Sequence, residues 1–208
     1  DSYNLIVLEE ISPISCQFEI RGKRKYFGKF LFDPDSPQVQ HEYQIITDLH
    51  LPTVPKARFG VDVPAARPGE TSTPLRITIM DYAEKKIEGK MLTAINFLDA
   101  LNDLWPVAGD PRNLSNLNKR MKTYINTLIA LAQTHVREYV NNDLKPENVL
   151  VFPDSQVLLT DWNIARKIGG PPKKKGGEVY GTSGYIAPER FRGEEGDPRS
   201  GDKLTLKV

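Results

Sequence analysis

The sequence Asp143-Leu144-Lys145-Pro146-Glu147-Asn148, followed downstream by Asp161-Trp162-Asn163, decides the fold of this chain. Its acidic, basic and amide side chains stand at spacings that suit phosphoryl transfer, where charge must be neutralised and an alcohol oriented. We therefore expect Asp143 to orient a hydroxyl group and Lys145 to steady a phosphate. Asn148 and Asp161 are the expected ligands of a magnesium ion.

The residues between the two motifs predict a hairpin. Residues 149–152 and 157–160 are apolar and rich in valine and leucine, which is typical of buried strands. Pro153-Asp154-Ser155 between them is a turn sequence. A hairpin of this kind would bring Asn148 and Asp161 to neighbouring strand ends.

Composition bounds the class of protein. With 208 residues, the chain is long enough for one large domain or two small lobes. A net charge of +1 argues against broad nucleic-acid binding, and the single cysteine excludes an internal disulfide framework. The sequence shows no apolar run of membrane-spanning length and no signal-peptide pattern. We expect an intracellular protein, cytoplasmic or nuclear, that binds neither nucleic acid nor membrane.

The character of the sequence changes near residue 85. Before it, strands are expected at residues 4–8, 17–20, 25–32 and 75–80, with a turn at Arg21-Gly22-Lys23 and a helix over residues 37–49. After it, helices are expected over residues 91–104 and 117–139, the second capped by Ser115 or Asn116. The stretches 65–74 and 169–177 are expected to be loops. The predicted core stripe of the second helix comprises Leu117, Met121, Tyr124, Ile125, Leu128, Ile129, Leu131, Ala132 and His135.

The opening motif resembles the catalytic and metal-binding loops of protein kinases, and its wording is typical of the serine/threonine branch. Further segments are similar to that family in the expected order. Met80-Asp81-Tyr82-Ala83 resembles the hinge between the lobes, and the segment from Gly181 to Ala187-Pro188-Glu189 resembles the end of the activation loop. The resemblance implies an α+β, two-lobed kinase-like fold. Its domains would be residues 1–83, a small antiparallel sheet with one helix, and residues 84–208, a mainly helical lobe lacking its last helices.

The resemblance also implies roles for individual residues. Lys29 would bind ATP phosphates from the third strand, paired with Glu42 on the following helix. The other nucleotide-binding residues would be Asp81, Ala83 and Leu150. In the catalytic group, Asp143 and Lys145 would be joined by Thr182, which would bond both of them. Magnesium would bind Asn148 and Asp161, so the implied cofactors are ATP and Mg2+.

Several positions depart from the family pattern. The stretch 12–17 contains no glycine, although the family places a glycine-rich loop there so that backbone amides approach the phosphates. Phe27 stands two residues before Lys29, where the family usually has a small alanine. Asn141-Asn142 replaces the usual His-Arg pair, which removes the cation that commonly binds an activation-loop phosphate. Trp162-Asn163 replaces Phe-Gly but keeps a large aromatic side chain.

The segment after Glu189 is shorter than in the family. The family continues with a buried helix and several further helices, whereas this sequence stops at Val208. We therefore expect a fragment, a truncated product, or a chain whose large lobe is covered by a partner. Exposed apolar surface on that lobe would be the sign.

Three functions fit these observations. The first is a protein kinase that phosphorylates serine or threonine of a protein substrate. The alternative is a pseudokinase, a kinase-shaped binding or scaffolding module, which the departures from the pattern favour. A small-molecule kinase is a third reading, but such relatives usually lack the segment that begins at Gly181. Its presence favours a protein substrate.

Overall fold

The computed structural model describes residues 5–12, 15–20, 25–32, 37–63, 75–107, 109–168 and 181–186. The chain divides into two compact units, one formed by Asp1–His50 with Pro55–Tyr82, the other by Leu51–Val54 with Ala83–Val208. The division after Tyr82 falls one residue from the boundary that the sequence predicts. The predicted turn 21–23, the predicted loops 65–74 and 169–177, and Ala187-Pro188-Glu189 lie outside the described residues.

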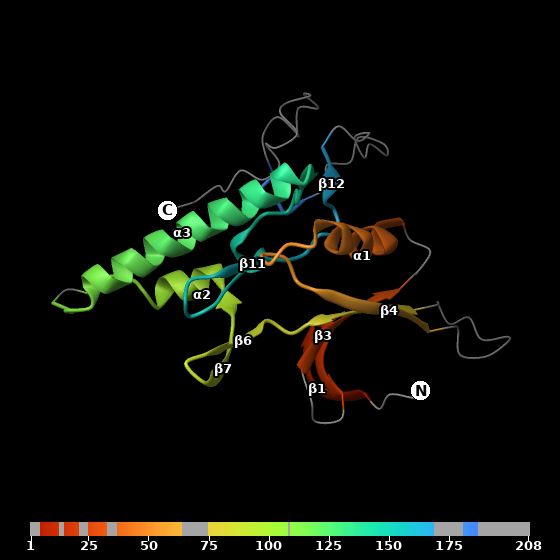
Figure 1. Cartoon of the computed structure of the whole chain (residues 1–208), viewed down its shortest axis with the longest axis horizontal. Coiled ribbons are helices and arrows are strands. Elements are labelled where there is room, and N and C mark those ends of the chain that lie inside the picture. The colour runs from red at the N-terminus through yellow and green to blue at the C-terminus, as the bar shows by residue number, and fades with distance from the viewer. Residues whose placement is uncertain are drawn as a thin grey trace. The chain divides into compact units, whose positions relative to one another are not determined.

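The first unit contains an antiparallel five-stranded sheet and one helix (Figure 1). The strands lie in the order β1 (Leu5–Ser12), β2 (Ser15–Ile20), β3 (Lys25–Phe32), β5 (Leu75–Asp81) and β4 (Ala57–Val63), and the helix is α1 (Pro37–Leu49). The four predicted strands and the predicted helix are therefore confirmed. Sequence reasoning missed β4, although Phe59, Val61 and Val63 alternate with polar or small residues as a strand should.

The core of the first unit forms where α1 and β5 bury their apolar side chains. Ile45, Ile46 and Leu49 are each at most 3% exposed, which accounts for the helical spacing of apolar residues in α1. Ile79 and Met80 supply the buried side chains of β5. Glu42, on the same helix, is 2% exposed, and a buried carboxylate requires a partner.

The second unit combines two helices with short strands. The helices are α2 (Phe97–Asn102) and the long α3 (Asn113–Val136), green in Figure 1. The strands are β6 (Glu84–Ile87), β7 (Lys90–Thr93), β8 (Ile95–Asn96), β9 (Tyr139–Val140), β10 (Val149–Val151), β11 (Val157–Leu159) and β12 (Arg166–Lys167). They pair as β11-β10-β8, β12-β9 and β6-β7. The predicted hairpin is confirmed, because β10 and β11 are antiparallel neighbours.

The predicted helix over residues 91–104 is wrong in its first half. Residues 90–93 form β7 and residues 95–96 form β8, so the helix begins only at Phe97. Asn96 explains the start, because its side-chain Oδ1 accepts a hydrogen bond from the Asp99 N–H at 3.0 Å. An asparagine in this position satisfies a backbone donor that the helix cannot satisfy itself.

The predicted limits of the second helix also need correction. Helix α3 begins at Asn113, so Ser115 and Asn116 lie inside it and do not cap it. Arg112 is the N-cap and makes no capping hydrogen bond with its side chain. The helix ends at Val136, and Tyr139 belongs to β9.

The predicted core stripe of α3 points mostly outward. Leu117, Met121, Ile125, Leu128 and Ile129 are 48%, 53%, 50%, 56% and 49% exposed. The buried residues are instead Thr123, Thr127, Ala130, Leu131 and Thr134. The spacing of apolar residues identified a stripe along the helix, but it did not show that a different face of the helix packs against the rest of the unit.

A threonine-rich face is suited to burial here because its hydroxyls are satisfied within the helix. Thr127 Oγ1 donates to the Thr123 carbonyl at 2.9 Å, and Thr134 Oγ1 donates to the Leu131 carbonyl at 2.8 Å. Their methyl groups remain available for packing against β9 and β11, the strands that α3 contacts. Among the described helices, none is both long and apolar enough to cross a membrane.

Candidate active site

Two loops of the second unit lie side by side because the same strand pairings hold both. One loop, residues 141–148, runs from β9 to β10; the other, residues 160–165, runs from β11 to β12. Strand β9 pairs with β12, and β10 pairs with β11. Both ends of the two loops are therefore fixed, and the motif residues are brought together from positions far apart in sequence.

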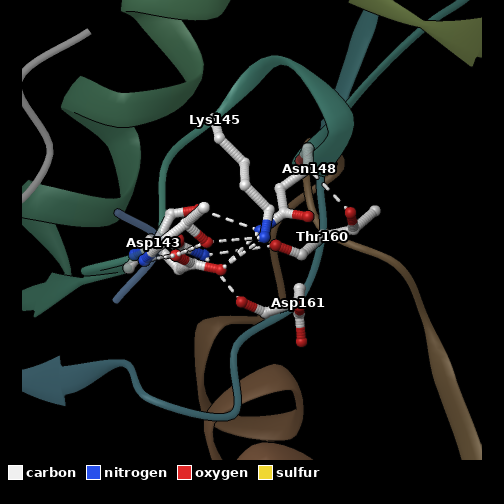
Figure 2. Close-up of polar contacts among 7 residues, drawn as sticks. Asp143, Lys145, Asn148, Thr160 and Asp161 are labelled. Carbon is white, nitrogen blue, oxygen red and sulfur yellow. Dashed lines mark hydrogen bonds and ion pairs between the residues drawn. The ribbon is translucent and has the colours of Figure 1, made fainter. Parts of the chain in front are cut away.

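Asp143 lies at the centre of a polar cluster (Figure 2) and is 8% exposed. Its Oδ1 accepts hydrogen bonds from the backbone N–H and the Oγ1 hydroxyl of Thr182, at 2.9 and 2.7 Å. Its Oδ2 lies 3.1 Å from Lys145 Nζ and 3.1 Å from Asn148 Nδ2. Both carboxylate oxygens are thus oriented by donors, so the direction in which Asp143 accepts a further proton is restricted.

Thr182 forms hydrogen bonds with both Asp143 and Lys145, the two partners that the resemblance implies. Besides donating to Asp143, its hydroxyl accepts a hydrogen bond from Lys145 Nζ at 2.7 Å. Gly181 allows this approach. It has a φ of +137°, and a Cβ added there would lie 2.8 Å from Ile186 Cγ1, so a side chain would be strained in conformation and in space.

Asn141 and Asn142 join the two loops, a function that sequence reasoning did not assign to them. Asn141 is 1% exposed; its Oδ1 accepts from the Asp143 N–H at 3.0 Å, and its Nδ2 donates to the carbonyls of Thr160 and Asp161 at 3.3 and 3.2 Å. Asn142 Nδ2 donates to the Ile164 carbonyl at 3.2 Å. The signal in the sequence was two adjacent amides, which donate and accept at once.

Asn148 is oriented in a way that fits a magnesium ligand. Its Nδ2 donates to the Asp143 carbonyl at 2.8 Å as well as to Asp143 Oδ2, so the donor end of the amide is fixed. Its Oδ1 accepts no hydrogen bond in the described part of the chain and remains available to a cation. Magnesium is commonly held by one or two side-chain oxygens together with substrate phosphates, which suits Asn148 with Asp161.

The two expected metal ligands are joined through Thr160. Its backbone N–H and Oγ1 donate to the Asn148 carbonyl at 2.9 and 3.1 Å. Asp161 follows at once, with a φ of +57°, a left-handed conformation that costs about 1–3 kcal/mol and concentrates at functional sites. Within the described residues, no group of three or more histidine, cysteine, aspartate or glutamate side chains forms a metal site.

Trp162 anchors the second loop. It is fully buried, and its Nε1 donates to the Leu159 carbonyl at 2.8 Å. The Trp162 carbonyl accepts from the Ala165 N–H at 3.1 Å, which closes the turn after it. The Trp162 side chain, which stands where the family has phenylalanine, therefore fixes the backbone next to Asp161.

In the first unit, the structure brings Lys29 and Glu42 together. Lys29 Nζ lies 3.1 Å from Glu42 Oε1 and 3.0 Å from Glu42 Oε2, and the two side chains are 12% and 3% exposed. The ion pair supplies the partner that the buried carboxylate requires. It also holds the ammonium group of Lys29 in one orientation.

The remaining predicted nucleotide-binding residues occupy varied environments. The Asp81 carboxylate accepts two hydrogen bonds from Arg58, both at 2.6 Å, and its backbone N–H donates to the Lys56 carbonyl at 3.0 Å. The Ala83 carbonyl accepts from the Ala94 N–H at 2.8 Å. Leu150 is half-buried in β10, where it pairs with Leu158.

Phe27 is half-buried on β3, and its pairing partner across the sheet is Met80 of β5. Lys29 follows on the same strand and pairs with Thr78. Two residues of a strand separated by one position face the same side of the sheet. Phe27 and Lys29 therefore belong to one face of the strand.

Comparison with known proteins identifies the class of domain to which these features belong. The family model described as the protein kinase domain matches residues 77–202, which is more than half of the chain. The chain is 32% identical over 138 residues to the serine/threonine-protein kinase PknA of Mycobacterium tuberculosis (strain ATCC 25618 / H37Rv). That alignment covers 63% of this chain and 30% of PknA.

Two shorter matches come from the same species. The chain is 37% identical over 70 residues to serine/threonine-protein kinase PknL of strain ATCC 25618 / H37Rv, covering 34% of this chain and 18% of PknL. It is 41% identical over 66 residues to serine/threonine-protein kinase PknD of strain CDC 1551 / Oshkosh, covering 32% and 10%. These matches span less than a third of the length of each relative.

Proposed function

Because this chain belongs to the protein kinase family, we propose that it transfers the γ-phosphoryl group of ATP to a serine or threonine hydroxyl of a protein substrate. The observation that carries this proposal is the arrangement around Asp143, whose two oxygens are oriented by Thr182, Lys145 and Asn148. PknA, PknL and PknD are all serine/threonine-protein kinases, which supports the same substrate class.

Asp143 would act on the substrate hydroxyl. The hydroxyl oxygen forms a bond to the γ-phosphorus, the bond from that phosphorus to the β–γ bridging oxygen breaks, and ADP leaves. The hydroxyl proton passes to the Asp143 carboxylate. Each oxygen has two donors, but those on Oδ2 are more distant, at 3.1 Å from Lys145 Nζ and Asn148 Nδ2, than the Thr182 donors on Oδ1, at 2.9 and 2.7 Å, so Oδ2 is the oxygen better placed to accept the proton.

Cations would stabilise the negative charge of the transferred group. Lys145 Nζ, held by Asp143 and Thr182, is positioned to contact a phosphoryl oxygen. Asn148 and Asp161 would bind magnesium, which neutralises phosphate charge when it is bound. In the first unit, Lys29 would bind ATP phosphates while Glu42 fixes its orientation.

The proposal is tested by incubating this chain with radiolabelled ATP, Mg2+ and a generic protein substrate. We expect label on serine or threonine, and we expect Asp143→Asn to lower kcat by roughly 100-fold or more, because general-base contributions are typically of that size. Asp154→Asn, a carboxylate substitution away from the two loops, is the matched control and should retain activity. A chain that binds Mg2+ and ATP normally but transfers no phosphate would refute the proposal.

Absence of phosphoryl transfer, with or without nucleotide binding, would favour a pseudokinase, the second candidate. The specific observations behind it are the glycine-free stretch 12–17 and the half-buried Phe27 beside the strand position of Lys29. A phenylalanine can occupy space that an adenine ring would need. In that case the ordered 141–148 loop would have a structural role.

The place of action follows from the proposed chemistry. Transfer from ATP requires a compartment that supplies the nucleotide, so we propose an intracellular location. Fractionation of expressing cells, with detection of the chain by an antibody, checks this. Recovery only from the culture medium would contradict it.

A further inference from the structure

The end of strand β5 lies beside an irregularity in its neighbour β4. Ala57 pairs with Met80, and the next pair along the two strands is Phe59 with Ile79. One step along β5 therefore corresponds to two steps along β4, and Arg58 is the extra residue of a β-bulge. Strand β4 is at the edge of the five-stranded sheet, where bulges are common. A bulge changes the direction in which its extra side chain points.

The bulged residue contacts Asp81, the last residue of β5. Arg58 Nε donates to Asp81 Oδ1 and Arg58 Nη2 donates to Asp81 Oδ2, each at 2.6 Å. The two side chains are 31% and 17% exposed. Most ion pairs near the surface contribute little to stability, but two parallel hydrogen bonds between a guanidinium and a carboxylate also fix geometry. Arg58 therefore restricts the orientation of Asp81.

The backbone around Asp81 is held as well. Its N–H donates to the Lys56 carbonyl at 3.0 Å, and on the other side Asp81 pairs with Tyr26 of β3. The ring of Tyr82, the next residue, has its centroid 6.0 Å from Lys25 Nζ, at the outer limit of a cation–π contact. Arg58 adds a side-chain contact to these, at the point where the predicted hinge begins.

The position of Asp81 relative to Lys29 gives this contact a specific consequence. Lys29 pairs with Thr78 and Tyr26 pairs with Asp81, so Lys29 and Asp81 are three positions apart along β3 and β5. At 3.3 Å per residue, the separation is about 10 Å along the strands. The hinge would contact the adenine ring through its backbone, and Lys29 would contact the phosphates. A displaced Asp81 would therefore disturb the adenine end of the nucleotide and leave the phosphate end in place.

We propose that Arg58 is a positioning residue for the nucleotide, which holds Asp81 so that the end of β5 is in the conformation that receives the adenine ring. The inference rests on the ATP binding that the proposed function requires. Arg58 itself would touch neither the phosphates nor the reacting hydroxyl. Its loss should therefore weaken ATP binding, by roughly three- to tenfold, and leave kcat unchanged.

Isothermal titration calorimetry of the full 208-residue chain tests the proposal with three probes: ATP with Mg2+, adenosine, and inorganic tripolyphosphate with Mg2+. Arg58→Ala should weaken ATP and adenosine by the same factor and leave tripolyphosphate unchanged. Arg58→Lys keeps the charge but cannot form the two parallel hydrogen bonds, so it should recover only part of the affinity. Lys56→Ala, at an exposed lysine, keeps the backbone carbonyl that Asp81 contacts and is the matched control. Equal weakening of all three probes by Arg58→Ala would indicate a loosened sheet and overturn the proposal.

A double-mutant cycle tests whether Arg58 acts through Asp81. Asp81→Ala removes the carboxylate, and in that background Arg58→Ala should have no further effect on the affinity for ATP. Melting temperatures of the variants check that each is folded. Effects of the two substitutions that simply add would contradict the proposal, because Arg58 would then act by another route.

The positioning role and the proposed function fail separately. In an active chain, Arg58→Ala should raise KM for ATP roughly three- to tenfold at unchanged kcat. Phosphoryl transfer with the same KM in the parent chain and in Arg58→Ala leaves the kinase proposal standing and overturns the positioning role. A chain that binds ATP, loses affinity in Arg58→Ala and transfers no phosphate refutes the kinase proposal and supports the positioning role. A parent chain that binds neither ATP nor adenosine overturns both.

Discussion

Asn141 illustrates what a single side chain contributes to the site. Its amide contacts the backbone of both loops, at Asp143 on one side and at Thr160 and Asp161 on the other. It touches no reacting atom, so it is a positioning residue. We predict that Asn141→Ala lowers kcat roughly 10- to 100-fold while the KM for ATP changes little, because the loops lose their shared contact but no binding group.

Steady-state kinetics and circular dichroism check this prediction. Asn141→His is the matched variant, since imidazole can also donate and accept hydrogen bonds, and it should recover part of kcat. A purely structural role for Asn141 would instead lower the melting temperature and the active fraction, with kcat per folded molecule unchanged.

Thr182 gives a second prediction at the residue scale. Its hydroxyl donates to Asp143 and accepts from Lys145, whereas its backbone N–H donates to Asp143 independently. Thr182→Val keeps the shape and the backbone contact but removes the hydroxyl. We expect kcat to fall about tenfold or more in Thr182→Val and to be largely retained in Thr182→Ser, measured with saturating ATP. Equal activity in the two variants would show that the hydroxyl is dispensable.

At the scale of the element, helix α3 is the most informative feature. Leu131 is 5% exposed and Ile125 is 50% exposed, although both belonged to the same predicted core stripe. We predict that Leu131→Ala lowers the free energy of unfolding by ~2–5 kcal/mol, as large-to-small core substitutions do. Ile125→Ala should cost less than about 1 kcal/mol. Urea denaturation monitored by tryptophan fluorescence measures both.

The two α3 variants also test whether the outward apolar stripe is covered. If the purified protein is an assembly in which another chain covers this stripe, Ile125→Ala should lower the free energy of unfolding nearly as much as Leu131→Ala does. Equal costs would therefore contradict the exposure that the structure assigns to Ile125.

The β10–β11 turn gives a prediction about pH. Partial burial raises the pKa of Asp154, but hydrogen bonds from Lys85 Nζ and from the Gln156 N–H outweigh it, so the pKa lies below its ordinary value. The pair therefore stabilises the folded state above the unfolded pKa of about 3.9, and the contribution is lost as the pH falls through the folded pKa. Because Lys85 and Asp154 are 34% and 29% exposed, the effect should be only ~0.2–1 kcal/mol.

Urea denaturation of the parent chain and of Asp154→Asn between pH 7 and pH 2.5 measures this contribution. The variant should be less stable at pH 7, and the difference should disappear at the lowest pH. A difference that stays constant over this range would assign it to packing rather than to the carboxylate charge.

Across the whole molecule, the sequence predicted the limits of helices and strands better than it predicted which side chains pack against other elements. Helix α1 and strand β3 have the predicted limits, because apolar spacing and turn residues act within each segment. The predicted orientation of α3 was wrong. Its buried face contains threonines whose hydroxyls bond within the helix, and a hydrophobicity pattern does not count threonines as core residues. The contacts of Thr182 with Asp143 and Lys145 are those that the resemblance implied, whereas Asn141 and Asn142, which join the two loops, were treated only as losses.

The last prediction concerns nucleotide binding by the whole chain. A ligand that binds only the folded state stabilises it by about 2.7 kcal/mol at a concentration 100 times its Kd, so Mg2+ and ATP together should raise the melting temperature by several degrees. Lys29→Met removes the expected phosphate contact and Asp161→Asn weakens the expected metal site, and each should reduce the shift. Lys56→Met, an exposed lysine of the same unit as Lys29, is the matched control and should leave it intact. If Mg2+ and ATP leave the melting temperature of the parent chain unchanged, the chain does not bind the nucleotide, and the pseudokinase replaces the proposed kinase.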